Sequence, residues 1–129
     1  MGLTDKVIFY GLSNQVAPLL WAMDVFAFPS IFEGLGIAAI EAQAAGLPTL
    51  VSDHIPAEAK LTPLLNTMPL AAGSGAWAEQ LLNLLPVEDR QCYAGQVRQA
   101  GFDVADVAKG VESCYKNMTD KGRVTCQII

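Results

Sequence analysis

The sequence predicts an α/β fold in which a Rossmann-like parallel sheet is flanked by helices. Between Lys6 and Asp53, short runs rich in β-branched and aromatic residues alternate with segments of helical character. Several of these runs are apolar throughout, as expected of strands that are covered on both faces. Short turns containing glycine or proline separate the elements, which suits strands joined by crossover helices.

The first half of the chain is predicted to follow the order strand, helix, strand, helix, strand. Ser13 or Asn14 is a suitable N-cap for the first helix, and Gly46 is a suitable stop for the second. The five elements are expected at residues 7–11, 13–23, 24–30, 34–46 and 47–53.

The second half has weaker signals. Pro56 and Pro63 indicate an irregular segment, and Gly73–Gly75 indicates a loop. A short fourth strand is expected at residues 67–71, followed by helices at 76–85, 87–100 and 104–118. We therefore expect one domain over residues 1–119 and a flexible tail over residues 120–129.

Composition excludes some function classes. The 129 residues are 52% hydrophobic and carry a net charge of −5, so there is no basic surface for nucleic acid. The longest apolar run, residues 16–32, is broken by Asp24 and two prolines and is too short to cross a membrane. The chain has no recognisable leader, and its three cysteines lack metal-type spacing, so we expect reduced thiols and a cytoplasmic location.

Ligands of open parallel sheets bind beyond the carboxyl ends of the strands. The turns to examine are therefore Gly11–Asn14, Ser30–Gly36 and Ser52–Ile55, which we expect on one edge. The second turn contains Gly34 and Gly36, which allow close approach of the backbone to a ligand. The helix after it would direct free amide groups toward an anion.

Two carboxylates, Glu33 and Glu41, flank and line this helix in an otherwise apolar segment. On one helix, eight positions correspond to a rotation of about 80° and a rise of about 12 Å. At that separation they cannot by themselves share a proton or a metal ion, so we expect no compact metal site. Because carboxylates accept hydrogen bonds from diols, the spacing suits an elongated ligand with hydroxyl groups at both ends and an anionic centre.

The segment FPSIFEGLGIAAIEAQAAGLPTLVSD, with VIFYG and WAMDVFAFPS before it, resembles the C-terminal donor-binding domain of the glycosyl transferases group 1, which are retaining enzymes of family 4 with the GT-B fold. The resemblance covers about residues 5–85. Its core is the E-x7-E signature, Glu33 to Glu41, followed by the G-x-P-x-x-x-S-D turn from Gly46 to Asp53.

The resemblance implies a nucleotide-sugar donor, often a UDP-sugar, whose hexosyl group is transferred with retention, and it implies no metal and no other cofactor. Glu33 would contact the hexose, and we place it as the catalytic candidate without assigning it as acid or nucleophile. Glu41 would contact the ribose hydroxyls. Further donor-binding candidates are Ser30, Gly34, Leu35 and Gly36, the last three through their amides.

The chain departs from the family pattern because the family has two Rossmann-like domains and this chain has room for part of the second. The family's basic diphosphate-binding residues lie upstream and have no match here. We therefore expect this chain alone to be inactive and to self-associate through its truncated sheet. In the intact enzyme, a glycan or lipid-linked acceptor would bind the N-terminal domain, in the cytoplasm or at the inner face of the membrane.

Alternative interpretations remain. Glu33 could simply favour the helix start, and Glu41 could lie in a solvent stripe with Gln43 or pair with a lysine. A nucleotide-sugar epimerase of GT-B architecture would also use acids around a ribose. A flavodoxin-like ligand-binding module is a third option, although the run VIFYGLSN lacks the acidic pair of a receiver domain.

Overall fold

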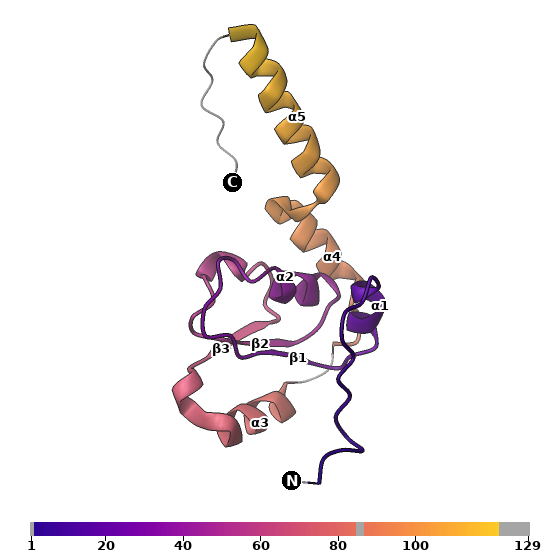
Figure 1. The fold of residues 1–129 in the computed structure, drawn as a ribbon, viewed down its shortest axis with the longest axis vertical. Helices are drawn as coiled ribbons and strands as arrows, with labels where there is room; N and C mark the ends of the chain where they lie inside the picture. Colours follow the sequence, from indigo (N-terminus) through magenta and orange to yellow (C-terminus); the bar gives the residue numbers. More distant parts are fainter. Residues whose placement is uncertain (1, 85–86, 122–129) are drawn as a thin grey trace.

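The computed structural model describes residues 2–84 and 87–121 (Figure 1). Its described residues contain a three-stranded parallel sheet in the order β1-β2-β3. The strands are β1 (Phe26–Phe28), β2 (Thr49–Ser52) and β3 (Leu65–Met68). The sheet is flanked by helices, so the α/β class predicted from the sequence is confirmed.

The helices vary in length and lie on both faces of the sheet, with α2 on one face and α3 on the other (Figure 1). The α-helices are α1 (Val16–Trp21), α2 (Ile37–Ala44), α3 (Gly73–Asn83), α4 (Gln91–Val97) and α5 (Val104–Lys121). Two 3₁₀ turns, Ala57–Ala59 and Leu70–Ala72, and a π-helical turn, Arg98–Phe102, complete the structure.

The core lies between α2 and the sheet. Phe26 and Phe28 contact core clusters on the α2 side, because alternate residues of a strand face the same way. Ala27 points to the other face, where it helps to line a hollow of about 390 Å³ beside α3. All four residues of β2 are buried, which explains why its sequence is a continuous run without alternation.

Helix α2 ends as the sequence predicts, at Gly46. This residue has φ +72°, and its amide donates to the Gln43 carbonyl at 2.9 Å. The next amide, of Leu47, donates to the Ala42 carbonyl at 3.0 Å, which completes a Schellman motif. This tight ending directs the chain into β2 after only two further residues and so fixes the distance between α2 and the sheet.

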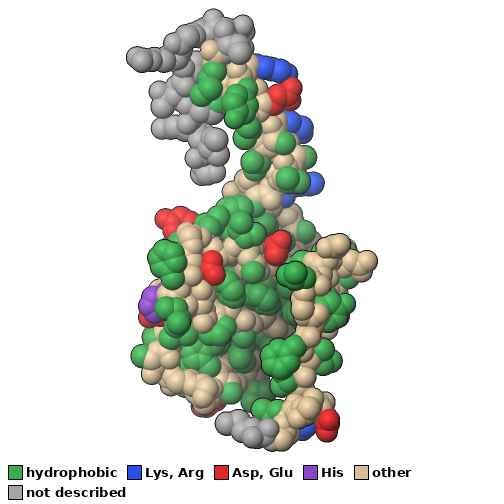
Figure 2. Space-filling view, viewed as in Figure 1, with side chains coloured by type: hydrophobic (Ala, Val, Ile, Leu, Met, Phe, Trp, Pro, Cys, Tyr) green, Lys and Arg blue, Asp and Glu red, His purple; other side chains and the backbone are tan. Residues whose placement is uncertain are grey.

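The prediction of a strand at Val7–Gly11 is wrong. The segment is extended but pairs with no strand in the described residues, and its side chains are exposed, Ile8 by 86% and Phe9 by 95%. Figure 2 shows apolar side chains along this segment, before α1. A strand needs a neighbour for its backbone groups, and local sequence cannot supply one.

Other boundaries also differ. β3 begins two residues before the predicted strand and ends at Met68, and the predicted loop at residues 73–75 is the first turn of α3. The helix expected at residues 87–100 is shorter, because α4 begins at Gln91. α5 continues through residues 120–121 of the expected tail, whereas residues 122–129 lie outside the described part.

The expectation of reduced thiols is correct only in part. Cys92 is free and exposed, whereas Cys114 in α5 is disulfide-bonded. A disulfide is unusual in a reducing compartment, so the cysteines give no support to the cytoplasmic expectation. None of the described helices has the length and hydrophobicity that a membrane crossing requires.

Candidate functional site

The carboxyl ends of β1 and β2 bring two of the three predicted turns together. The hydroxyl of Ser52, at the end of β2, donates a hydrogen bond to the carbonyl of Ser30, which follows β1. Gly36 lies beside Ile55, since a Cβ built on this glycine would be 3.5 Å from the Ile55 side chain. The turn Gly11–Asn14 follows no strand, so the reason for expecting it at this edge does not hold.

Glu33 is half-buried in the loop between β1 and α2. Its Oε1 atom accepts a hydrogen bond from the Ser30 hydroxyl at 3.2 Å. Because α2 begins only at Ile37, Glu33 is not on the helix, and the helical estimate of its separation from Glu41 does not apply. The carboxylate is instead positioned by the loop that closes over the sheet edge.

The start of α2 has no side-chain cap. Gly36 occupies the N-cap position with φ +79°, which glycine adopts without strain, and no side chain caps the helix. The first helical amides therefore have no side-chain acceptor, and the macrodipole favours negative charge there. Gly34 is exposed, whereas the Leu35 side chain packs on the core cluster and holds the loop down.

Glu41 lies one turn into α2 and is exposed. It borders a hollow of about 180 Å³ between α1 and α2, together with Leu20 and Ala44. Within the described residues its side chain has no hydrogen bond and no ion pair, so the proposed lysine pair is not observed. The alternative that Glu41 and Gln43 share a solvent-exposed face of the helix is also wrong, because Gln43 is completely buried.

Gln43 is the important residue that sequence reasoning missed. Its amide nitrogen donates to the Ala39 and Ala59 carbonyls at 3.0 and 2.8 Å. Its oxygen accepts from the Leu61 amide and from the amide and hydroxyl of Thr62, at 3.0 to 3.1 Å. The available signal was spacing, since position 43 follows Ala39 by four residues and shares its buried face.

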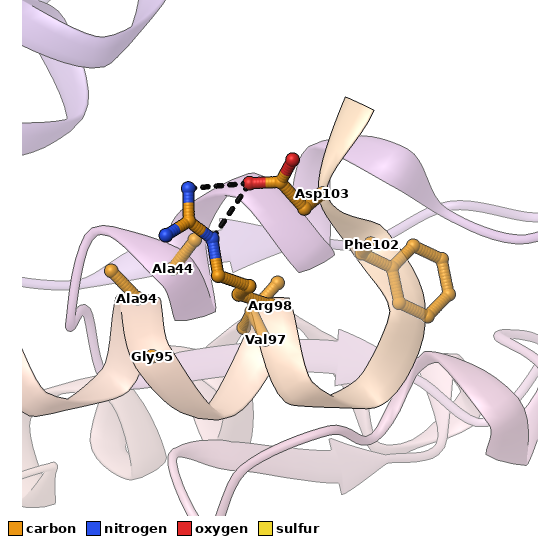
Figure 3. Close-up of a pocket in the computed structure, with 7 residues that line it drawn as sticks. All are labelled: Ala44, Ala94, Gly95, Val97, Arg98, Phe102 and Asp103. Carbon is orange, nitrogen blue, oxygen red and sulfur yellow. Dashed lines mark hydrogen bonds and ion pairs between the residues drawn. The ribbon is translucent and has the colours of Figure 1, made fainter. Parts of the chain in front are cut away.

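A second hollow, of about 360 Å³, is lined by Ala44 of α2, by α4 and by the segment Arg98–Asp103 (Figure 3). Arg98 and Asp103 point toward each other across it, with Arg98 Nε 2.7 Å from Asp103 Oδ2. This bond, with the amides of Ala105 and Asp106, lowers the pKa of the Asp103 carboxyl. The pair anchors the start of α5, which extends away from the sheet (Figure 1).

The remaining titratable groups of the edge form no metal centre in the described residues. His54 and Asp53 are both about half exposed, and their side chains approach to 3.3 Å. No group of three or more histidine, cysteine or acidic side chains in the described part could hold an ion. The expectation that no metal takes part stays a prediction.

The parallel sheet, the glycine loop and α2 define an α/β domain with polar side chains at the carboxyl edge of its sheet. The chain belongs to the glycosyl transferases group 1, whose family profile matches residues 1–87. The family resemblance stated from the E-x7-E segment is thus confirmed at this level. No solved structure matches the chain.

Named relatives agree with the family. EpsF of Bacillus subtilis, named as a glycosyltransferase, is 29% identical over 122 residues, covering 92% of this chain and 32% of that protein. The UDP-Gal:alpha-D-GlcNAc-diphosphoundecaprenol alpha-1,3-galactosyltransferase of Escherichia coli is 42% identical over 53 residues, covering 41% of this chain and 14% of that enzyme. The chain thus spans about a third or less of the length of these relatives.

Proposed function

We propose that this chain is the donor-binding part of a retaining GT-B glycosyltransferase. The reaction transfers a hexosyl group from a nucleoside-diphosphate sugar, a UDP-sugar, to the hydroxyl of a glycan or lipid-linked acceptor. A UDP-sugar and a lipid-linked acceptor are supported by the name of the Escherichia coli relative. The relatives are named as transferases, which favours this function over an epimerase.

The observation that carries the proposal is the placement of Glu33 and Glu41 on either side of an uncapped helix start. Glu33 stands before α2, while Glu41 stands one turn inside it on an exposed face. Carboxylates are strong acceptors for hydroxyl groups, so the two can bind the hexose and the ribose of one donor. The amides of Gly34, Leu35 and Gly36 lie in the chain between them and suit the diphosphate.

Neither acid has an alternative role in stability that would explain it. Burial of an unpaired carboxylate would cost several kcal/mol, but Glu41 is exposed and Glu33 has a hydroxyl partner. Asp and Glu near a helix start contribute under about 1 kcal/mol. Ligand binding therefore accounts better for both positions. We propose that no metal or other cofactor takes part, and that the intact protein works in the cytoplasm or at the inner membrane face.

The test is ligand-observed NMR with UDP, UDP-glucose, UDP-galactose and free hexose. Three proteins are compared: the parent chain, Glu41→Ala, and Glu79→Ala as a matched control on an exposed face of α3. We expect weak binding of UDP to the parent. Hydrogen bonds to charged groups contribute about 1.5–3 kcal/mol, so Glu41→Ala should weaken UDP binding by roughly ten- to a hundredfold.

The Glu79→Ala variant should bind UDP like the parent, because α3 lies on the opposite face of the sheet from α2 (Figure 1). Equal UDP binding by the Glu41→Ala variant and the parent would refute the role of Glu41. Binding of free hexose or unrelated nucleotides with the same affinity as UDP would refute a nucleotide-sugar donor.

A further inference from the structure

We propose that Ser52 and Ser30 are positioning residues that hold the Glu33 carboxylate for the hexose of the donor. The proposal rests on the function proposed above. It assigns Ser30 a role different from direct donor binding, and it gives Ser52 a role in the site. Neither residue needs to touch the donor.

The first link joins the ends of two strands. Ser52 is the last residue of β2 and is completely buried. Its hydroxyl donates to the Ser30 carbonyl, two residues beyond the end of β1. The strand ladder has stopped there, since the last paired residues of β1 and β2 are Phe28 and Val51. The Ser52 hydroxyl therefore links the two chain segments beyond the last backbone pair of β1 and β2.

The second link joins Ser30 to the carboxylate. The Ser30 hydroxyl has one proton and two acceptors within reach, the Phe32 carbonyl at 3.1 Å and Glu33 Oε1 at 3.2 Å. A hydrogen bond to an ionised carboxylate is stronger than one to a neutral carbonyl, so the proton favours Glu33. The Phe32 carbonyl serves as the alternative when Glu33 is removed.

The consequence is an oriented carboxylate with one oxygen left for a ligand. Oε1 of Glu33 is engaged by Ser30, whereas Oε2 has no hydrogen-bond partner in the described residues. The backbone around Ser30 is anchored to the most buried strand, so the side chain of Glu33 starts from a fixed point. A carboxylate that is already ordered loses less conformational entropy when it binds a sugar hydroxyl.

The effect should be confined to the sugar half of the donor. Ordering a side chain of this type changes affinity by about three- to tenfold. We expect Ser52→Ala to reduce, by that factor, the affinity of a UDP-sugar relative to UDP. UDP itself should bind unchanged, because Glu41 and the helix start do not depend on this link.

The first experiment needs no ligand. The χ1 rotamer of Glu33 is measured by three-bond NMR couplings in the parent, Ser52→Ala, Ser52→Thr and Ser74→Ala, the last a control at an exposed serine. We expect one rotamer in the parent, averaging in Ser52→Ala, and recovery in Ser52→Thr, which keeps the hydroxyl. Ser74→Ala should match the parent. Unchanged couplings in Ser52→Ala would overturn the proposal.

Ser30→Ala covers the case in which Ser52→Ala does not fold, because it removes the second link from a loop rather than from the buried strand. Averaged Glu33 couplings in this variant support the proposal, and parent-like couplings overturn it. The affinity ratio of UDP-sugar to UDP then tests the functional consequence. If the affinity for UDP is the same in Glu41→Ala and the parent, the proposed function is wrong. If Glu33 keeps a single χ1 rotamer in Ser30→Ala or Ser52→Ala, only this inference is wrong.

Discussion

The substitution Gly46→Ala should destabilise the fold by an amount that two structural terms determine. Gly46 has φ +72°, and an L-residue in this region costs about 1–2 kcal/mol. An added Cβ would also lie 2.5 Å from the Cβ of Arg90 and 2.7 Å from its Cα and carbonyl oxygen. The Cα and the carbonyl oxygen belong to the main chain, so the backbone itself must move.

The movement would disturb the hydrogen bonds of the Arg90 guanidinium. This group donates to the carbonyls of Gly46, Trp21 and Met23 at 3.3, 3.1 and 2.6 Å, so it connects α1, the end of α2 and the start of α4. Hydrogen bonds from charged donors contribute about 1.5–3 kcal/mol when intact. Weakening them and straining the backbone together should cost at least about 3 kcal/mol.

Urea unfolding followed by far-UV circular dichroism measures this loss. Gly101→Ala is the matched control, because Gly101 has φ +93° and ψ +11° but open space around its Cβ position. It should lose only the conformational term, about 1–2 kcal/mol. Gly75→Ala, inside α3 with nothing nearby, should gain about 0.5–1 kcal/mol. If Gly46→Ala is no less stable than Gly101→Ala, the contact with Arg90 carries no energy and the reasoning is wrong.

Three further outcomes are expected. Gln43→Leu should lower the free energy of unfolding in urea by more than about 3 kcal/mol, because it leaves buried hydrogen-bond donors of Leu61 and Thr62 without an acceptor. The control Gln80→Leu, on an exposed face, should change it by under about 0.5 kcal/mol. Because folding lowers the pKa of Asp103, its ionised carboxylate stabilises the fold at pH values above the ordinary aspartate pKa of about 3.9. This stabilisation is lost as the pH falls through the pKa of the folded state. In thermal unfolding, the stability difference between the parent and Asp103→Asn should therefore close on acidification from about pH 6 to pH 2, and a constant difference would contradict this. Light scattering should give the parent a mass above that of one 13.7 kDa chain, lowered by Phe9→Glu but not by Leu82→Glu; a single-chain mass for the parent would refute self-association.

The central elements of the fold could be predicted because local signals and tertiary structure agree there. β2 is completely buried and lies within the strand predicted at residues 47–53, and Gly46 both ends α2 and occupies a left-handed conformation. The same agreement placed the loops at Ser30–Gly36 and Ser52–Ile55 on one edge. Parallel topology fixes that edge once the strand order is known.

The segment Val7–Gly11 could not be predicted correctly because its strand character is only a propensity. Its residues favour extended backbone, and the structure keeps them extended, but no neighbouring strand is present in the described residues. α3 shows the opposite case, in which Gly73 and Gly75 suggested a loop and tertiary packing placed them in a helix. In both cases a long-range contact, or the lack of one, decided the outcome.

The two polar residues of α2 show where pattern reading fails within the site. Glu41 and Gln43 are two positions apart, so they lie on different faces of a helix, yet both looked like solvent positions in an alanine-rich segment. Their fates differ because only Gln43 faces the 59–62 segment, whose backbone supplies partners for every polar atom of its amide. Burial of a polar side chain follows from available partners, and these come from elsewhere in the chain.

The uncovered face of α2 is the strongest reason to look for a ligand there. Half of the residues of α2 are buried, yet Ile37 is 64% exposed and Glu41, one turn later, is exposed on the same side. A contact between an apolar side chain and an unpaired carboxylate on an exposed face does not stabilise the fold. A ligand with an apolar ring face and hydroxyl edges would contact both, as a nucleoside or a sugar does. If the Glu41→Ala variant proves as stable as the parent but binds UDP more weakly, this face serves binding rather than folding.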